Sequence, residues 1–386
     1  MKICDITFLY FPRGGGIKTY IDAKRAEYKK INIQHFIIAP ETHASSAIRK
    51  ETQGSLSLYY VPSIKLSVNG VTYYIFKHFK YLQEILLQEK PNIIEIGDKF
   101  TTLFFYSKIL ALKKILSAKI FVFSHERADN FIHVAYGLYR GHSFIKAVKS
   151  YFFISFENIL MKKFTGAADE IICNSEFTAQ EIRPYTTKPI HILSLGIEKE
   201  DFENNAYFDQ TLRDKLSAFG EKKIIIHIGR LDKDKKIELL IDIAKKLDPK
   251  KYILIVVGGG SEEKELKKIS CVYLTGYIKR EEVRKYLSIA DLGILVNNIE
   301  PFGLVALEMM AISLPILGPN EGGLSGILKE SFSWKLPYSL SSYLGALDEW
   351  EKRSDKKNMK RNAREEFLAH YTSTSMVENL LRIYKG

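Results

Sequence analysis

The chain has 386 residues, of which 46% are hydrophobic, 12% aromatic and 26% charged. This composition is typical of a globular protein with two buried cores, and it argues against disorder. No run approaches the roughly 20 apolar residues of a membrane-spanning helix. Residues 1–195 carry 26 basic and 16 acidic side chains, whereas residues 196–386 carry 31 and 29. This asymmetry favours an anionic partner for the first half, such as a lipid surface, a phosphorylated acceptor or a nucleic acid, over a merely solubilising surface.

Three cysteines, Cys4, Cys173 and Cys271, lie far apart, within or beside apolar runs. They lack metal-ligand spacing, so we expect buried, reduced thiols. Residues 1–10 run directly into an apolar strand without a small-residue cleavage site, which argues against a signal peptide. We therefore expect a cytoplasmic protein.

The first half of the chain alternates short apolar runs with amphipathic segments. A glycine turn and a helix follow the first run, and residues 73–89 have the spacing of an amphipathic helix. The alternation predicts a doubly wound parallel sheet. The expected strands are residues 2–10, 33–40, 58–63, 92–98, 119–125 and 170–175.

The pattern restarts with expected strands at residues 223–229, 252–260, 271–277 and 291–296. We therefore predict an α/β protein with two Rossmann-like domains, residues 1–196 and 197–371, and a C-terminal helix, 372–386, that could pack on either domain. The segment 150–164 is more apolar than a surface helix. It predicts either a buried or interdomain helix or an interfacial helix that lies on lipid.

Two glutamates frame the strongest local motif, EPFGLVALE at residues 300–308. The motif follows an apolar strand, and Pro301 and Gly303 lie where the chain would turn into a helix. If most of the motif is helical, about 12 Å separates Glu300 from Glu308. One carboxylate could then bind a sugar hydroxyl while the other binds a ribose. The alternative is a surface helix with two solvated carboxylates. Free backbone amides at the helix start would attract phosphate, and they belong to Phe302, Gly303 and Leu304.

A second motif, GRLDKDKK at residues 229–236, comes directly after an expected strand. Ligands usually bind outside the carboxyl ends of parallel strands, so this basic turn would face an anionic ligand. Arg230 can grip a diphosphate through its planar guanidinium, and Lys235 can add a point charge. The alternatives are an ordinary charged turn and, for Asp232 and Asp234, a metal-binding Asp-x-Asp pair.

A third motif, RGGG at residues 13–16, follows the first expected strand. Glycines let the backbone approach a ligand, and the next helix would add its positive end. The run lacks the spacing of a dinucleotide-binding loop and the Lys-Ser/Thr ending of a P-loop, so both interpretations lose support. His125 stands at the end of another expected strand, where a lone histidine is more often structural than functional.

In combination these motifs resemble the retaining glycosyltransferases of family 4, which have the GT-B fold. The resemblance rests on the glycine loop after the first strand, on Arg-x4-Lys from Arg230 to Lys235, and on Glu-x7-Glu from Glu300 to Glu308. The segments IIEIGD and SHERAD are further similar to bacterial α-mannosyltransferases that act on lipid or glycan acceptors. The resemblance implies two Rossmann-like domains that face each other across a cleft.

The resemblance also implies a role for each site residue. Arg230 and Lys235 would hold the donor diphosphate, and Glu308 would bind the ribose hydroxyls. Glu300 would contact the transferred sugar and His125 would face it, so these two residues, with Arg230 and Lys235, are the expected catalytic residues. Further donor contacts are implied at Gly15, Gly16, Gly258, Tyr277, Phe302, Gly303 and Leu304.

Two positions depart from the family pattern. Lys236 stands where a glycine is expected, and residues 258–261 read GGGS where Gly-Asp-Gly-Pro is usual. Neither departure removes a charged contact.

By this resemblance the chain would be a metal-independent, retaining hexosyltransferase of cell-envelope polysaccharide synthesis. Mannose from GDP-mannose is the leading donor, the acceptor would be lipid-linked or a glycan, and no cofactor is expected. The alternatives are a UDP-sugar-dependent transferase, a UDP-sugar 2-epimerase of the same fold, and a basic membrane- or nucleic-acid-binding protein. No nucleic-acid partner is expected, because the basic residues are not part of a recognised nucleic-acid motif. The basic first half predicts a peripheral position at the inner face of an anionic membrane.

Overall fold

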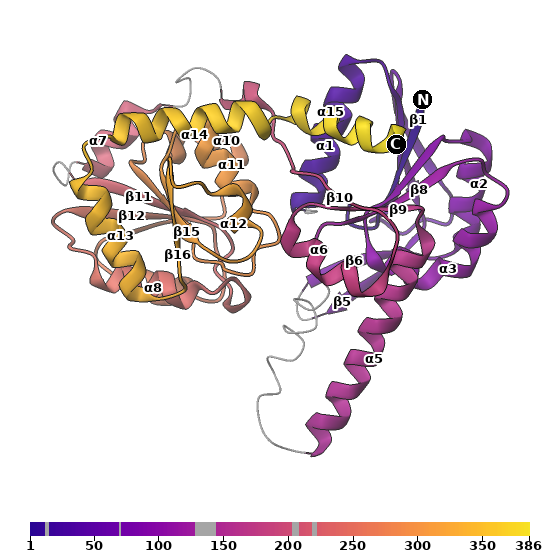
Figure 1. Cartoon of the computed structure of the whole chain (residues 1–386), viewed down its shortest axis with the longest axis horizontal. Coiled ribbons are helices and arrows are strands. Elements are labelled where there is room, and N and C mark those ends of the chain that lie inside the picture. Colours follow the sequence, from indigo (N-terminus) through magenta and orange to yellow (C-terminus); the bar gives the residue numbers. More distant parts are fainter. Residues whose placement is uncertain (12–14, 69–70, 128–143, 203–207, 218–221) are drawn as a thin grey trace. The chain divides into compact units, whose positions relative to one another are not determined.

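The computed structural model describes residues 1–11, 15–68, 71–127, 144–202, 208–217 and 222–386 (Figure 1). The chain divides into two compact units. Unit 1 comprises Met1–Leu195 and Met376–Gly386, and unit 2 comprises Gly196–Ser375. Helix α15 (Ser373–Lys385) therefore starts in unit 2 and continues in unit 1.

Unit 1 is built on an eight-stranded sheet with the order β10-β9-β8-β7-β1-β2-β4-β3. The pairings from β10 to β4 are parallel, and the edge strand β3 runs antiparallel to β4. The strands are β1 (Lys2–Ile6), β2 (Gln34–Pro40), β3 (Arg49–Gln53), β4 (Leu56–Val61), β7 (Ile93–Ile96), β8 (Lys119–Ser124), β9 (Glu170–Cys173) and β10 (Ile190–Ile192).

Helices pack on this sheet and bury its apolar strands. Helix α5 packs along α3, and within its described part Met161 and Phe164 are fully buried whereas Ile159 is exposed. Within the described residues, the helices of unit 1 are α1 (Gly15–Lys30), α2 (Phe79–Glu89), α3 (Lys99–Lys113), α5 (Phe144–Ala167), α6 (Glu176–Ile182), the 3-10 helix η2 (Arg183–Tyr185) and most of α15.

The helix expected over residues 73–89 is wrong in its first part. Tyr73 lies in β6 (Val71–Phe76), which pairs with β5 (Ser63–Val68) in an antiparallel hairpin, and helix α2 begins only at Phe79. Aromatic and β-branched side chains favour a strand once a partner strand is present. The local apolar spacing could not reveal that partner.

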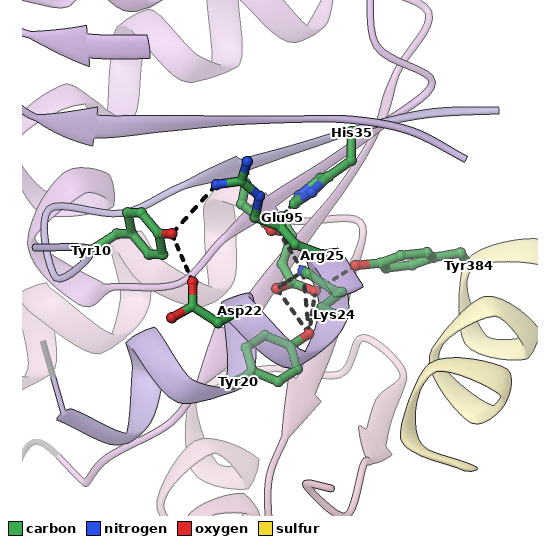
Figure 2. A network of polar contacts seen from close by, with 9 residues as sticks. Tyr10, Tyr20, Asp22, Lys24, Arg25, His35, Glu95 and Tyr384 are labelled. Atoms are coloured by element: carbon green, nitrogen blue, oxygen red, sulfur yellow. Dashed lines mark hydrogen bonds and ion pairs between the residues drawn. The ribbon is translucent and has the colours of Figure 1, made fainter. Parts of the chain in front are cut away.

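A buried polar network joins the sheet of unit 1 to its helices (Figure 2). Lys24 of α1 is fully buried, and its Nζ lies 2.6 Å from a carboxylate oxygen of Asp5 and 2.9 Å from one of Glu95. Burial would lower the pKa of Lys24, but the two carboxylates outweigh it and raise that pKa. Tyr20 of α1 donates to Glu95 at 3.1 Å, and Tyr384 of α15 donates to the same carboxylate at 2.5 Å. The C-terminal helix is therefore fastened to unit 1 by a buried hydrogen bond.

Unit 2 contains a parallel sheet with the order β13-β12-β11-β14-β15-β16, the arrangement of a doubly wound fold. The expected doubly wound sheets are confirmed in both units. The strands are β11 (Lys223–Ile228), β12 (Tyr252–Val257), β13 (Val272–Gly276), β14 (Leu292–Ile294), β15 (Ile316–Pro319) and β16 (Ser333–Leu336). The helices are η3 (Lys199–Phe202), α7 (Gln210–Ser217), η4 (Lys233–Lys235), α8 (Ile237–Lys246), α9 (Glu263–Leu266), α10 (Arg280–Ser288), α11 (Leu304–Ala311), α12 (Leu324–Ile327), α13 (Leu340–Lys352) and α14 (Lys356–His370).

Strand order fixes where ligands can bind in such sheets. The connections reverse direction between β11 and β14 in unit 2, and between β1 and β7 in unit 1. Ligands of doubly wound sheets bind at the carboxyl ends of the strands at such switch points. Of the helices in the described ranges, none is long and apolar enough to span a membrane. Cys4, Cys173 and Cys271 are buried and unpaired, as expected.

Candidate active site

Two loops meet at the switch point of unit 2, one after β11 and one after β14. Lys235, at the end of η4, places its Nζ 3.3 Å from Oε2 of Glu300. The side-chain amide of Asn297 donates to the same oxygen at 2.8 Å. About a third of each charged side chain is exposed, with values of 30% for Lys235 and 29% for Glu300. The structure therefore brings together a cation and a carboxylate from the two strongest sequence motifs.

The guanidinium of Arg230 is held by two aspartates of its own loop. Its Nη1 lies 2.5 Å from Asp232 and its Nη2 lies 2.7 Å from Asp234. Burial would lower the pKa of Arg230, but the two carboxylates outweigh it and raise that pKa. The Arg230 side chain is 48% exposed, so an incoming anion could compete with the aspartates for it. Within the described part of the chain, no group of three or more His, Cys, Asp or Glu side chains is placed to share a metal ion.

A glycine loop after β12 packs directly on the Arg230 loop. Gly258 has φ +131°, and a Cβ there would lie 2.0 Å from the carbonyl oxygen of Gly229. Leu231 donates its backbone N–H to the carbonyl of Gly259 at 2.9 Å. Tyr277, which is 72% exposed, covers the next position, because a Cβ on Gly259 would lie 2.8 Å from its ring. Gly258 thus allows the two loops to pack closely, and Tyr277 lies over the neighbouring glycine.

Helix α11 begins only at Leu304, so Glu300 lies in the preceding loop and the geometry expected for a mostly helical motif does not apply. Gly303 caps the helix with φ +107°, a conformation that favours glycine, and Phe302 is buried. Gly323 donates its N–H to the carbonyl of Glu300 at 2.7 Å. The position of Glu300 is therefore set by contact with a loop that follows β15.

Glu308 of α11 forms a separate ion pair. Its Oε1 lies 3.2 Å from Nη2 of Arg280, at the start of α10, and its side chain is 14% exposed. Burial raises the pKa of Glu308, and Arg280 opposes that shift. Arg280 was not predicted as a site residue, because in sequence it resembles any charged residue in the first turn of a helix.

A pocket of about 700 Å³, part of it open to solvent, lies at the switch point of unit 1. It is bordered by the ends of β1, β7 and β8 and by α1, α3, β6 and α5. One of its residues, His125, was predicted from the sequence as a site residue. The other lining residues are Phe8, Leu9, Ile17, Tyr73, Gly97, Asp98, Lys99, Phe100, Phe123, Glu126, Arg127, Phe156 and Leu160.

His125 is 7% exposed, and its ring stacks on Phe123 with the ring centroids 3.9 Å apart. Burial, with smaller effects of the Lys24 and Lys99 charges, lowers its pKa to about 3. The imidazole is therefore neutral near pH 7. Its Nε2 is buried and has no hydrogen-bond partner among the described residues, an arrangement that calls for an explanation.

Gly15 and Gly16 open helix α1 and are exposed. Gly15 has φ +59°, and Ile17, one position further on, lines the pocket of unit 1. The first two residues of the RGGG motif, 13 and 14, lie outside the described residues. The predicted site residues are therefore divided, with Gly15, Gly16 and His125 in unit 1 and the rest in unit 2.

Family comparisons match both halves of the chain. Residues 14–201 match Glycosyltransferase Family 4, and residues 208–366 match Glycosyl transferases group 1. The crystal structure of the Anabaena protein HepE in complex with UDP matches with a TM-score of 0.72, covering 100% of both chains at 13% sequence identity. Two doubly wound units in this arrangement along the chain define a protein of the GT-B fold. The chain belongs to the GT-B glycosyltransferases.

Curated relatives extend these matches at low identity. An uncharacterized glycosyltransferase of Methanocaldococcus jannaschii is 24% identical over 235 residues, which cover 56% of this chain and 60% of that protein. A GDP-mannose-dependent alpha-(1-6)-phosphatidylinositol dimannoside mannosyltransferase of Mycobacterium tuberculosis is 22% identical over 342 residues, 85% of this chain and 82% of that protein. The archaeal match thus spans less than two thirds of its relative, whereas the mycobacterial match spans most of both chains.

Proposed function

We propose that the chain is a retaining hexosyltransferase that binds a nucleotide-sugar donor in unit 2 and transfers the sugar to an acceptor hydroxyl bound by unit 1. The observation that carries this proposal is the Lys235–Glu300 ion pair at the switch point of unit 2, with Arg230 on the same loop as Lys235. Lys235, which contacts the loop before α11, and Arg230, on the same loop as Lys235, would together bind a diphosphate.

In this proposal the cations act on the leaving group. As the bond between the anomeric carbon and the phosphate oxygen breaks, its electron pair stays on that oxygen, and Arg230 and Lys235 stabilise the added charge. The acceptor oxygen bonds to the anomeric carbon from the same face, and its proton passes to the leaving phosphate oxygen. Glu300 would position the sugar by accepting hydrogen bonds from the sugar hydroxyls. The backbone amides of Phe302, Gly303 and Leu304 would point toward the phosphate. No covalent sugar–enzyme bond is needed, and the same charges would serve without a metal ion.

The remaining site residues would bind the nucleotide and the acceptor. Glu308, held by Arg280, would accept hydrogen bonds from the ribose hydroxyls, and Gly258 and Tyr277 would border the donor. Gly15, Gly16 and His125 would serve the reaction from unit 1, where neutral His125 could exchange one hydrogen bond with a sugar hydroxyl.

GDP-mannose is the leading donor, and a lipid-linked or glycan acceptor of the cell envelope is the leading acceptor. Support comes from the mycobacterial relative, whose name specifies both GDP-mannose and a phosphatidylinositol mannoside. A UDP-sugar is the second candidate, because the Anabaena structure of the same fold holds UDP. A peripheral position at an anionic membrane would suit a lipid-linked acceptor and the basic first half of the chain.

A ligand panel tests the proposal. Thermal unfolding of the whole chain is measured with GDP-, UDP- and ADP-sugars, because a ligand of the native state raises the melting temperature. One of these sugars should give a clear rise, and the product with acceptor should be a glycoside with the anomeric configuration of the donor. A free epimerised sugar would identify an epimerase, an inverted glycoside would refute retention, and loss of activity in EDTA would refute metal independence. If no nucleotide sugar shifts the melting temperature, the proposed donor class is wrong.

A further inference from the structure

The pocket at the switch point of unit 1 has mainly hydrocarbon walls. Phe100 of α3 and Phe156 of α5 form part of its rim and are only partly buried. Phe104, which is 52% exposed, stacks on Phe100 with the ring centroids 6.2 Å apart, so the apolar surface continues outward along α3. The apolar lining residues include Phe8, Leu9, Ile17, Phe100, Phe156 and Leu160.

Asp98, Lys99 and Arg127, three of the charged residues that line the pocket, have partners within the protein. Lys99 donates to the hydroxyl of Ser124 at 3.0 Å and to the carbonyl of Glu126. Asp98 accepts the backbone N–H of Thr101 at 2.6 Å, which caps α3. A free sugar would need several unsatisfied donors and acceptors to replace its hydration, and Lys99 and Asp98 are already engaged.

Arg127 is engaged in the same way, because it donates to the carbonyl of Phe177 at 3.1 Å. His125 differs from these residues. Its side chain is more than nine-tenths buried, it lines the pocket, and its Nε2 has no partner in the described part of the chain. An apolar cavity with one convergent polar group suits an amphiphile whose hydrocarbon part lies next to a hydroxyl.

We propose that this pocket receives a hydrocarbon chain of the acceptor, so that the acceptor is a lipid-linked glycan or lipid rather than a free oligosaccharide. The inference rests on the proposed transferase function and specifies its acceptor class. The chain would pack against Phe100 and Phe156, and Nε2 of His125 would bond a polar group at the head of that chain. The pocket lies at the switch point between β1 and β7, where doubly wound sheets usually bind their ligands.

The test compares two probes that share a sugar and differ in the chain, n-octyl β-D-glucoside and methyl β-D-glucoside. Binding to the whole chain is followed by saturation-transfer NMR, with the octyl compound kept below its micelle concentration. The octyl protons should receive saturation and give a measurable Kd, whereas the methyl glucoside should bind at least about tenfold more weakly, a difference of about 1.4 kcal/mol.

Three variants locate the binding. Phe100→Ser and Phe156→Ser should each weaken octyl glucoside at least about fivefold, whereas Phe208→Ser, which changes a 42% exposed phenylalanine of unit 2, should leave its Kd unchanged. Thermal unfolding checks that each variant is folded, and having two rim variants keeps the test valid if one is not. Equal affinity for the two glucosides, or an unchanged Kd in a folded rim variant, overturns the proposal. An equal loss in Phe208→Ser does the same, because it shows nonspecific detergent binding.

The same measurements separate this proposal from the transferase function. Octyl glucoside binding is measured without a donor, and the nucleotide-sugar panel is measured without an acceptor. If the panel gives no shift but Phe100→Ser loses octyl glucoside, the apolar site stands and the transferase assignment fails. If the panel shifts the melting temperature but octyl and methyl glucosides bind alike, the enzyme uses a different acceptor class.

Discussion

Lys235 and Glu300 lie 65 positions apart in the sequence, yet their charged groups are 3.3 Å apart. The contact exists because β11 and β14 are neighbours in the sheet of unit 2. Both side chains are partly exposed, so the pair adds little to stability. In the proposed donor site, the pair would hold a cation in place before an anionic ligand binds.

Replacing Lys235 by methionine should lower kcat about 100-fold, because the proposed site would lose one of the two cations that stabilise the leaving diphosphate. Donor consumption is measured at saturating donor and acceptor. Lys233→Met is the matched control, since Lys233 is exposed in the same 3-10 helix, and it should retain wild-type kcat. Equal kcat in the two variants would contradict the proposed role.

Replacing Glu308 by glutamine should weaken donor binding about tenfold with a smaller effect on kcat. The amide of glutamine has one acceptor oxygen where the carboxylate has two, so it can accept fewer hydrogen bonds from the ribose. The substitution also leaves Arg280 without its carboxylate partner. Isothermal titration with the donor found in the panel gives the Kd. Glu281→Gln, at an exposed position of α10, should bind the donor normally. A normal Kd for Glu308→Gln would remove Glu308 from the donor site.

Gly323→Ala should destabilise unit 2 by at least about 2 kcal/mol and lower turnover. The new Cβ would lie 2.0 Å from the carbonyl oxygen of Pro301 and would push the Glu300 loop away. Gly326→Ala, three positions on, meets nothing within 4 Å and should be neutral or up to about 1 kcal/mol stabilising. Urea unfolding of the two variants tests this difference in stability. Similar midpoints would show that the two loops can move apart without destabilising unit 2.

Buried His227 predicts acid sensitivity of unit 2. It is 4% exposed, its Nδ1 lies 3.0 Å from the carbonyl of Ile294, and burial lowers its pKa to about 4. Between pH 6.5 and 4 the unfolded chain binds a proton that the folded chain refuses, so stability falls as the pH falls through this window. From pH 7 to pH 5 the loss should be about 2 kcal/mol.

The variant His227→Asn should lose less stability between these two pH values, because asparagine can keep the bond to Ile294 without titrating. His43→Asn, which changes an exposed histidine, should follow the wild type. Urea midpoints at pH 7 and pH 5 measure both. If all three proteins lose the same stability on acidification, a different group carries the effect.

Tyr384→Phe should destabilise unit 1 by about 1–3 kcal/mol, because it leaves the buried carboxylate of Glu95 with one donor fewer. Burial already raises the pKa of Glu95, and losing the Tyr384 hydroxyl should raise it further. Tyr338→Phe removes a hydroxyl bonded to a carbonyl at 3.2 Å on the surface of unit 2 and should cost less. Urea unfolding measures the loss of stability in both variants. Equal losses would show that the Tyr384 hydrogen bond does not hold α15 on unit 1.

Much of the fold could be predicted from the sequence, because strands buried on both faces read as continuous apolar runs, such as residues 223–229. The hairpin β5–β6 could not, since the apolar spacing around Tyr73 suits a helix as well as a strand. Only its pairing with Leu66 decides between them. The strands β15 and β16 were also missed, because four-residue segments carry too little periodicity.

The candidate site was partly predictable for a related reason. Lys235 and Glu300 were each identified from local chemistry, but their contact depends on strand order, which local patterns do not contain. The apolar pocket of unit 1 escaped prediction except at His125. Phe100 and Phe156 belong to helices that are far apart in the sequence, and phenylalanine is also an ordinary core residue. The sequence therefore does not distinguish the residues that line the pocket from those of the core.

The last turns of α15 belong to unit 1, so unit 1 includes both the first and the last residues to be synthesised. Unit 2 is continuous from Gly196 to Ser375, so a ribosome synthesises all of its strands before Met376 is added. Until Tyr384 emerges, the nascent first domain holds Glu95 without one of its buried donors. Although its first residue is made earliest, this domain is therefore completed after its neighbour, and translation that stops near residue 375 would yield one finished domain and one unfinished domain for chaperones or proteases to handle.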